Sequence, residues 1–337
     1  MHNDAVVFRI TELFFDGHKV TRIAQLINEE FDLRPPLTRE SVYPLLSTAA
    51  EREFIRLVPP LDVALQKAIV KQFGLEADMV RVVQIPNPAS NDRVAAAAAD
   101  LAYQVMSTLG RGDKPIGVGL GPGRATLEFS RHLGQRLRAE PLPWKLKLFS
   151  ISAGAPSGSP EYAPASFFNL FPAELTDSRR GLFADVLIRT RDFSKVRKSP
   201  GARKMFDERG EISLIVTSMG DASDKHDLLR RFLLEAGEKE ERFSGWRGNV
   251  QYRPFSDKGP AVERADDLRA VTAFELKELV HIASRRDKHV LLIAKQCGSC
   301  GKTKARALRP LLEVPALRVF TSLVLDDKTA RDLIEKM

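Results

Sequence analysis

The strongest indication of the fold comes from Ile116-Gly-Val-Gly-Leu-Gly-Pro-Gly-Arg-Ala-Thr-Leu127, in which a short strand ends in closely spaced glycines and a helical pattern follows at once. Glycines let backbone N–H groups turn toward an anion, and a helix N-terminus adds unpaired donors and a positive dipole end. Arg124 and Thr126 add a guanidinium and a hydroxyl, which suit phosphate oxygens. The stretch therefore predicts a phosphate site, although an ordinary strand-to-helix connection would give the same pattern.

Apolar strands alternate with helical stretches on both sides of this segment, which favours an α/β fold with a Rossmann-like parallel sheet and helices on both faces. The segment 154–178 between them is rich in Gly, Pro and Ser and carries aromatic residues. We expect either a functional loop there or a loop whose aromatics pin it to the body. The expected strands are 80–85, 114–120, 146–152, 184–190, 211–217, 289–294 and 317–325, and the expected helices are 94–109, 125–137, 227–235 and 273–285.

The first 60 residues predict a separate, smaller helical domain. A first helix covers residues 5–16, and two later apolar stripes recur at i, i+3, i+4 and i+7, starting at Val20 and at Val42. A strand is expected at 54–58, ended by two prolines. We expect a boundary near residue 60, with a linking helix over 61–75 opening a large domain of residues 61–337.

The second and third helices form the pair expected of a helix-turn-helix, whose second member enters the major groove of DNA. Their connection, residues 29–37, is longer than the usual tight turn, so we expect a variant of this motif with winged-helix-like character. Pro44 is tolerated only near the start of a helix, so the third helix is expected to begin with Ser41 as its N-cap rather than Thr38. The expected contacts to bases or phosphates come from Arg22, Arg34, Thr38, Arg39, Ser41 and Tyr43.

Charge and composition narrow the function classes. The 337 residues carry a net charge of +8, but residues 1–60 hold seven basic against nine acidic side chains, so charge alone is weak support for DNA binding. No apolar run is long enough to cross a bilayer, and two cysteines cannot build a multi-bridge framework. We expect a cytoplasmic protein that does not engage a membrane.

The two cysteines form the motif Cys297-Gly-Ser-Cys300. A preceding strand and a following helix with lysines would lower the pKa of a thiol, which suggests a redox or metal role. Zinc normally needs four ligands, and the spacing to the available histidines is unlike common zinc modules. The favoured interpretation is a loop of small residues that lines a ligand site, with no metal and no cofactor.

The glycine turn and four later segments resemble motifs of known proteins. The run 119–126 resembles the phosphate loop of the ribose-phosphate isomerase, glucosamine-phosphate deaminase and CoA-transferase fold group. The segments that follow it occur in the order typical of the SorC family of sugar-binding transcription regulators, and the resemblance spans nearly the whole chain. These segments are 211–220, 248–259, 300–308 and 323–330.

The resemblance implies a regulator that binds an operator in double-stranded DNA as a homodimer or homotetramer and senses a sugar or a phosphorylated sugar. It implies effector contacts from Gly121, Gly123, Arg124, Thr126 and Lys304. No catalytic residue is expected, because the acidic motif of the isomerases is absent and the histidines form no evident catalytic pattern. A sugar-phosphate isomerase or deaminase with a helical extension is the alternative, and a redox protein built on the two cysteines is a third possibility.

Overall fold

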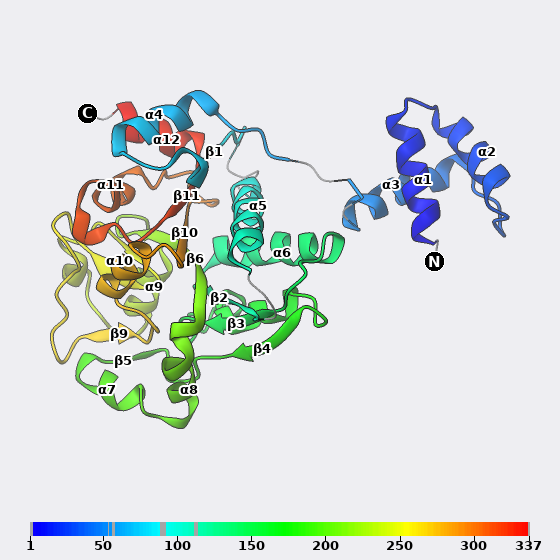
Figure 1. Cartoon of the computed structure of the whole chain (residues 1–337). Helices are drawn as coiled ribbons and strands as arrows, with labels where there is room; N and C mark the ends of the chain where they lie inside the picture. The colour runs from blue at the N-terminus through cyan, green and yellow to red at the C-terminus, as the bar shows by residue number, and fades with distance from the viewer. Residues whose placement is uncertain (1–2, 53, 56–57, 88–91, 111–113, 336–337) are drawn as a thin grey trace. The chain divides into compact units, whose positions relative to one another are not determined.

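The structure is a computed structural model that describes residues 3–52, 54–55, 58–87, 92–110 and 114–335. The chain forms two compact units, one of residues 1–58 with 135–141 and the other of residues 59–134 with 142–337. Figure 1 labels the elements of both units. Within the described ranges no helix is both long and apolar enough to cross a bilayer.

The N-terminal unit is built on three helices, α1 (Asp4–Phe15), α2 (Val20–Glu30) and α3 (Arg39–Glu51). The two apolar stripes face a common core, as their spacing predicted. The long connection between α2 and α3 is held by Asn28, whose side-chain amide donates to the Leu37 carbonyl at 2.9 Å and whose Oδ1 accepts from the Leu37 N–H at 2.7 Å. The buried members of this core are Val6, Val7, Ile10, Leu13, Ile23, Ala24, Ile27, Leu37, Val42, Leu45 and Ala49.

The start of α3 differs from the prediction. Thr38, not Ser41, is the N-cap, and Pro44 lies inside the helix. Because proline has no N–H, the usual bond to the Glu40 carbonyl cannot form. The hydroxyls of Thr38 and Ser41 share a hydrogen bond of 2.9 Å, and the Thr38 side chain accepts none from a backbone N–H. Packing of Val42, which is fully buried, holds the first turn of α3 in the helix despite the proline.

The predicted strand at 54–58 is not found where the structure describes it. Phe54 and Ile55 lie in a bend and pack partly against the helical core. Residues 56–57 lie outside the described residues.

The large unit is an α/β fold around a sheet in which seven parallel strands run in the order β1-β11-β10-β6-β2-β3-β4. Two short strands extend the sheet on β6, since β7 pairs antiparallel with β6 and β8 with β7. This confirms the predicted parallel sheet. The strands are β1 (Val80–Val83), β2 (Ile116–Leu120), β3 (Leu146–Ser150), β4 (Thr176–Arg180), β6 (Ile212–Asp221), β7 (Gly248–Val250), β8 (Arg253–Phe255), β10 (His289–Ala294) and β11 (Ser322–Asp326).

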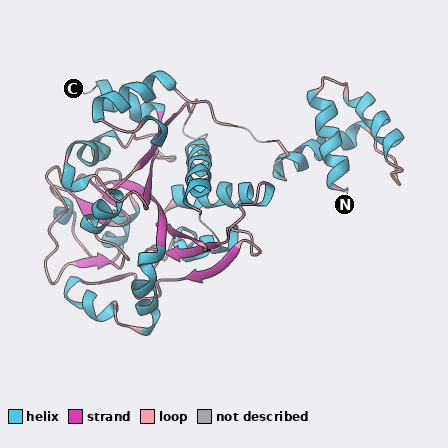
Figure 2. Cartoon of the chain, viewed as in Figure 1, coloured by secondary structure: helices cyan, strands magenta, loops and turns pink. Residues whose placement is uncertain are grey.

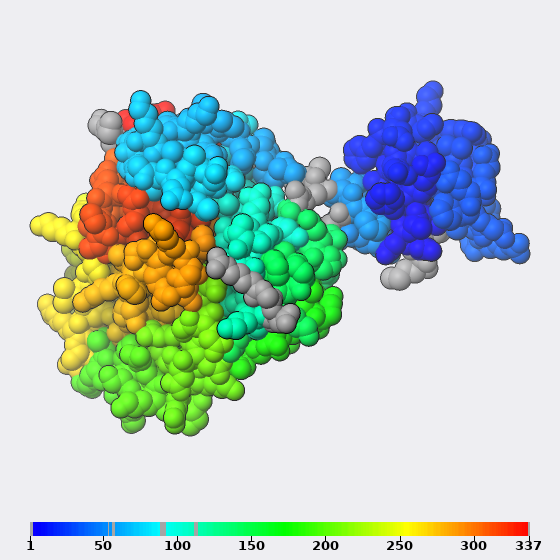
Figure 3. Space-filling model, in the orientation of Figure 1, coloured from blue at the N-terminus to red at the C-terminus, as the bar shows by residue number. Residues whose placement is uncertain are grey.

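Helices cover both faces of this sheet (Figure 2). Alternate strand residues divide between the faces: Leu323 and Leu325 belong to the largest core cluster, whereas Val324 between them does not. The linking helix α4 lies against the C-terminal helix α12 (Figure 3). The helices of the unit are α4 (Val63–Phe73), α5 (Asp92–Leu109), α6 (Arg124–Ala139), α7 (Phe193–Val196), α8 (Pro200–Glu208), α9 (Leu228–Glu235), α10 (Leu276–Ala283), α11 (Ala305–Glu313) and α12 (Asp327–Glu335).

Three of the predicted segments need correction. The strand expected at 184–190 is the short β5 (Leu187–Arg189), which pairs antiparallel with β9 (Leu268–Ala270) in a separate sheet. The strand expected at 317–325 starts only at Ser322, after a 3₁₀ turn at Pro315–Leu317. The expected loop 154–178 contains 3₁₀ turns and runs into β4, an edge strand of alternating half-buried and exposed residues. Apolar content marked the central strands but not the polar edge strand β4, and it did not indicate which partner each strand would meet.

Candidate functional site

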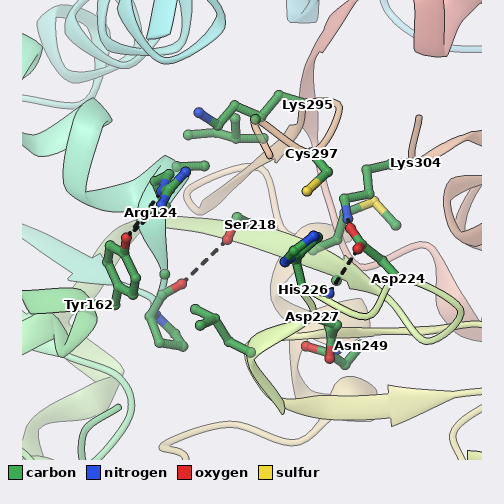
Figure 4. Close-up of a pocket in the computed structure, with 18 of the residues that line it drawn as sticks. Arg124, Tyr162, Ser218, Asp224, His226, Asp227, Asn249, Lys295, Cys297 and Lys304 are labelled. Atoms are coloured by element: carbon green, nitrogen blue, oxygen red, sulfur yellow. Dashed lines mark hydrogen bonds and ion pairs between the residues drawn. The ribbon is translucent and has the colours of Figure 1, made fainter. Parts of the chain in front are cut away.

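A cavity of about 230 Å³ lies at the carboxyl ends of β2, β6 and β10. In parallel α/β sheets this edge is where ligands bind, because loops and helix N-termini converge there. Figure 4 shows side chains from all three loops around it. The lining residues that carry polar or charged groups include Arg124, Tyr162, Ser218, Asp224, His226, Asp227, Arg231, Asn249, Lys295, Cys297 and Lys304.

The glycine turn after β2 reaches the cavity only in part. The Gly121 N–H donates to the Val216 carbonyl at 2.8 Å, and a Cβ on Gly121 would meet the Thr217 hydroxyl at 2.3 Å. Gly121 is therefore required for packing between β2 and β6, and it does not line the cavity. Gly123 does line it and has a φ of +112°, which favours glycine. Its N–H donates to the Tyr162 carbonyl at 3.1 Å.

Helix α6 begins directly after this turn, at Arg124. Its first-turn N–H groups have no intrahelical carbonyl to bind. Thr126 in this turn is fully buried, and its hydroxyl has no hydrogen-bond partner within the described part of the chain. Thr126 lies beneath the cavity rather than in its lining.

Arg124 projects from the start of α6 toward the aromatic loop. Its Nε and Nη2 donate to the Tyr162 hydroxyl at 3.1 and 3.0 Å, and the guanidinium lies 5.7 Å from the centre of that ring. Tyr162 is neutral, so this contact orients the guanidinium without compensating its charge. The buried aromatics Phe167, Phe168 and Phe171 pin the same loop to the body.

Lys304 forms the opposite part of the lining and is tied to Asp224. The Lys304 Nζ lies 3.0 Å from the Asp224 Oδ2, and the two residues are 7% and 2% exposed. Burial alone would raise the pKa of Asp224, but the charge of Lys304 and the N–H of His226 outweigh it and lower that pKa. Burial likewise opposes, but does not overcome, the rise that Asp224 imposes on the pKa of Lys304.

A second carboxylate lies beneath this pair. Asp227 caps α9 by accepting from the Arg230 N–H at 2.8 Å, and it accepts from the Asn249 amide at 3.0 Å. Burial raises the pKa of Asp227. Neither carboxylate was among the predicted site residues, although both follow the carboxyl end of β6, where side chains of a parallel sheet converge on a site.

The two cysteines are free thiols, and Cys297 lines the cavity while Cys300 is exposed. The expected lowering of a thiol pKa is wrong for Cys297, because burial raises its pKa more than neighbouring backbone N–H groups lower it. Folding also brings Asp224 close to both sulfurs, which the sequence did not indicate.

In the N-terminal unit, most of the predicted DNA-contact residues are exposed. Arg39 and Tyr43 lie four residues apart on one exposed face of α3, whereas Ser41 is half-buried and held by Thr38. Arg22 lies 3.8 Å from Glu29 and Arg34 lies 3.1 Å from Asp32.

The family profile described as "Putative sugar-binding domain" matches residues 60–335. The full-length sorbitol operon regulator SorC from Klebsiella pneumoniae is 17% identical, with 99% of this chain and 100% of that chain covered and a TM-score of 0.65.

Two further solved structures share the fold of the large unit. A transcriptional regulator from Streptococcus pneumoniae is 13% identical over 81% of this chain and 96% of that chain, with a TM-score of 0.61. A DeoR family transcriptional regulator from Listeria monocytogenes is 14% identical over 80% of this chain and 98% of that chain, with a TM-score of 0.57. No curated protein matches the chain. The family match confirms the resemblance to SorC-type proteins that the sequence indicated, and the chain belongs to the family defined by this sugar-binding domain.

Proposed function

We propose that the protein is a transcription regulator that binds operator DNA through its N-terminal unit and senses a sugar or phosphorylated sugar in the cavity of its large unit. The family profile and the position of the cavity at the carboxyl ends of β2, β6 and β10 support the sugar-sensing part. The similar structures are those of transcription and operon regulators, which supports the regulatory part.

The charge of Arg124 is the observation that favours a phosphorylated effector over a neutral sugar. Four cationic side chains line the cavity, and three of them lie within 4.0 Å of a carboxylate: Lys295 of Glu128, Lys304 of Asp224 and Arg231 of Glu235. Among the described residues Arg124 has no such partner.

Arg124 is also the first residue of α6. The first-turn N–H groups of a helix point out of its N-terminus, which is the positive end of the helix dipole. A phosphate held there would gain charge-assisted hydrogen bonds from the guanidinium and direct ones from the backbone. The buried Lys304 and Asp224, whose charges compensate each other, suit the sugar hydroxyls at the other end of the cavity.

Calorimetric titration with sugars and their phosphate esters tests this proposal. Arg124→Ala should weaken binding of the phosphate ester by roughly ten- to a hundredfold, which corresponds to about 1.4–2.7 kcal/mol. Arg131→Ala is the matched control, because Arg131 is exposed on the same helix and does not line the cavity. If a neutral sugar binds the wild-type protein as tightly as its ester, the effector is not phosphorylated.

For DNA, we propose that the exposed face of α3 contacts base edges through Arg39 and Tyr43. Arg22, Arg34 and Thr38 contact phosphates, and Ser41 supports Thr38 rather than reaching the DNA itself. Arg39→Ala should weaken specific binding to the operator at fixed salt by about 1–3 kcal/mol if the contact is to a base. Lys67→Ala, outside the N-terminal unit, is the control, and equal affinity of both variants would contradict the assignment.

Acidic side chains outnumber basic ones in the first 60 residues, nine to seven, so a single copy of the N-terminal unit gains little from phosphates. We propose that a homodimer or homotetramer supplies the missing affinity, because paired half-sites convert the second contact into an intramolecular one. Sedimentation of the full chain, with and without operator DNA, measures the number of copies.

A further inference from the structure

A cluster of metal-binding atoms lies where the loop after β10 meets the loop after β6. The two sulfurs of Cys297 and Cys300 and a carboxylate oxygen of Asp224 all lie within 4.8 Å of one another. Figure 4 shows the Cys297 sulfur on the same side of the cavity as Lys304 and Asp224. The proposed effector site uses neither sulfur.

The cysteine loop is closed by its own backbone. The Cys297 N–H donates to the Lys302 carbonyl and the Gly301 N–H donates to the Cys297 carbonyl, both at 2.8 Å. Gly301 has a φ of +69°, a conformation that favours glycine. These contacts fix the loop that carries both sulfurs.

We propose that Cys297, Cys300 and Asp224 bind a divalent zinc-type cation at the edge of the cavity. Zinc is favoured because thiolate and carboxylate ligands at C-x-x-C spacing suit its tetrahedral coordination. Two thiolates, one carboxylate and the Lys304 ammonium sum to a charge of −2, which a divalent cation compensates. From the sequence, the motif supplied only two ligands; folding adds the third.

The spacing of Cys300 and Asp224 is close to that of two zinc ligands. The Cys300 Sγ lies 3.9 Å from the Asp224 Oδ1. In a tetrahedral site, with zinc about 2.3 Å from sulfur and about 2.0 Å from oxygen, those two atoms are about 3.5 Å apart. Lys304 engages Oδ2, so Oδ1 keeps a lone pair for a metal while it accepts from the His226 N–H at 2.9 Å.

Three protein ligands leave one coordination position for water or for a donor from the cavity. Cys297 and Asp224 both belong to the lining of that cavity, whereas Cys300 is exposed to solvent. Such a site is open on the cavity side, as in zinc sites that exchange their fourth ligand.

The test uses the full chain, reduced, treated with a chelator and dialysed, then titrated with ZnCl₂ and separately with CoCl₂. We expect one zinc per chain and, with cobalt, the intense near-ultraviolet absorption of thiolate-to-metal charge transfer. Mutation of a residue that only hydrogen-bonds to a metal ligand already weakens metal binding by about 10–100-fold. Because Cys297 and Cys300 are ligands themselves, Cys297→Ser and Cys300→Ser should each weaken zinc binding by more than about a hundredfold.

Ser299→Ala is the matched control, since it lies in the same loop, is exposed and leaves all three ligands and the backbone donors in place. It should bind zinc as the wild type does. Asp224→Asn also breaks the pair with Lys304, so circular dichroism first checks that this variant folds. If it does not fold, the two cysteine variants decide the proposal. Stoichiometric zinc retained by the double serine variant, absence of thiolate absorption with cobalt, or no binding by the reduced wild type would each overturn the proposal. None of these outcomes depends on the sugar effector.

Discussion

The two ends of the cavity hold their cations in opposite ways. Lys304 is buried and lies 3.0 Å from the buried carboxylate of Asp224. Arg124 is exposed and bonds only to the neutral Tyr162 hydroxyl within the described residues. A buried charge requires a partner of opposite sign, whereas an exposed guanidinium is stabilised by water. The first arrangement should therefore stabilise the fold, and the second should leave a charge available for a ligand.

The largest effect is expected at the buried pair. Lys304→Met leaves the Asp224 carboxylate buried without its cation, and breaking a buried pair in this way typically removes about 3–5 kcal/mol of the free energy of unfolding. Urea unfolding followed by circular dichroism measures it. The control is Lys302→Met, an exposed lysine two residues away that donates to Ser223, and its loss should stay within about 1.5 kcal/mol.

The same pair makes stability depend on pH. The pKa of Asp224 is lower in the folded protein than in the unfolded chain, where it is about 3.9, so the stabilisation is present above that value. It is lost as the pH falls through the folded pKa. Urea midpoints of the wild type and Asp224→Asn should therefore differ at pH 7 and begin to converge as the pH falls below about 4. A constant difference across this range would mean that the carboxylate is not ionised in the fold.

A smaller effect is expected at the glycine turn beside Arg124. Gly121→Ala places a methyl group 2.3 Å from the Thr217 hydroxyl, and overpacking of this kind destabilises by about 1–3 kcal/mol. Gly158→Ala is the control, since a Cβ there meets nothing within 4 Å. Thermal unfolding of both variants separates the two interpretations of the glycine turn: a purely anion-binding Gly121 would tolerate alanine when no ligand is present.

The smallest effect on stability is expected at Arg124 itself. Arg124→Ala removes two hydrogen bonds from an exposed side chain and should change the free energy of unfolding by less than about 1.5 kcal/mol. The same urea experiment measures it. A loss as large as that of Lys304→Met would show that both ends of the cavity are structural, and the comparison between them would fail.

The strand, turn and helix of residues 116–139 follow from local sequence. Ile116, Val118 and Leu120 alternate with glycines that a crowded central strand accepts, and a Cβ on Gly117 would meet the Glu211 carbonyl oxygen at 2.3 Å. The helical period of α6 starts at the predicted place. The same holds for the apolar stripes of α2 and α3, because the pattern of buried side chains along one helix is a property of a few successive residues.

The sequence by itself thus determined the parallel α/β class, the helical N-terminal unit and the resemblance to the SorC family, since these rest on periodicity and on motifs in order. Only the tertiary structure decided that α3 begins at Thr38, that β5 pairs with β9, and that Asp224 meets both Lys304 and the cysteines. Each of these depends on residues that are distant in the chain or on packing that outweighs a local preference. Side chains at the ends of β6 and β10 become neighbours only because those two strands pair, and no local pattern encodes that pairing.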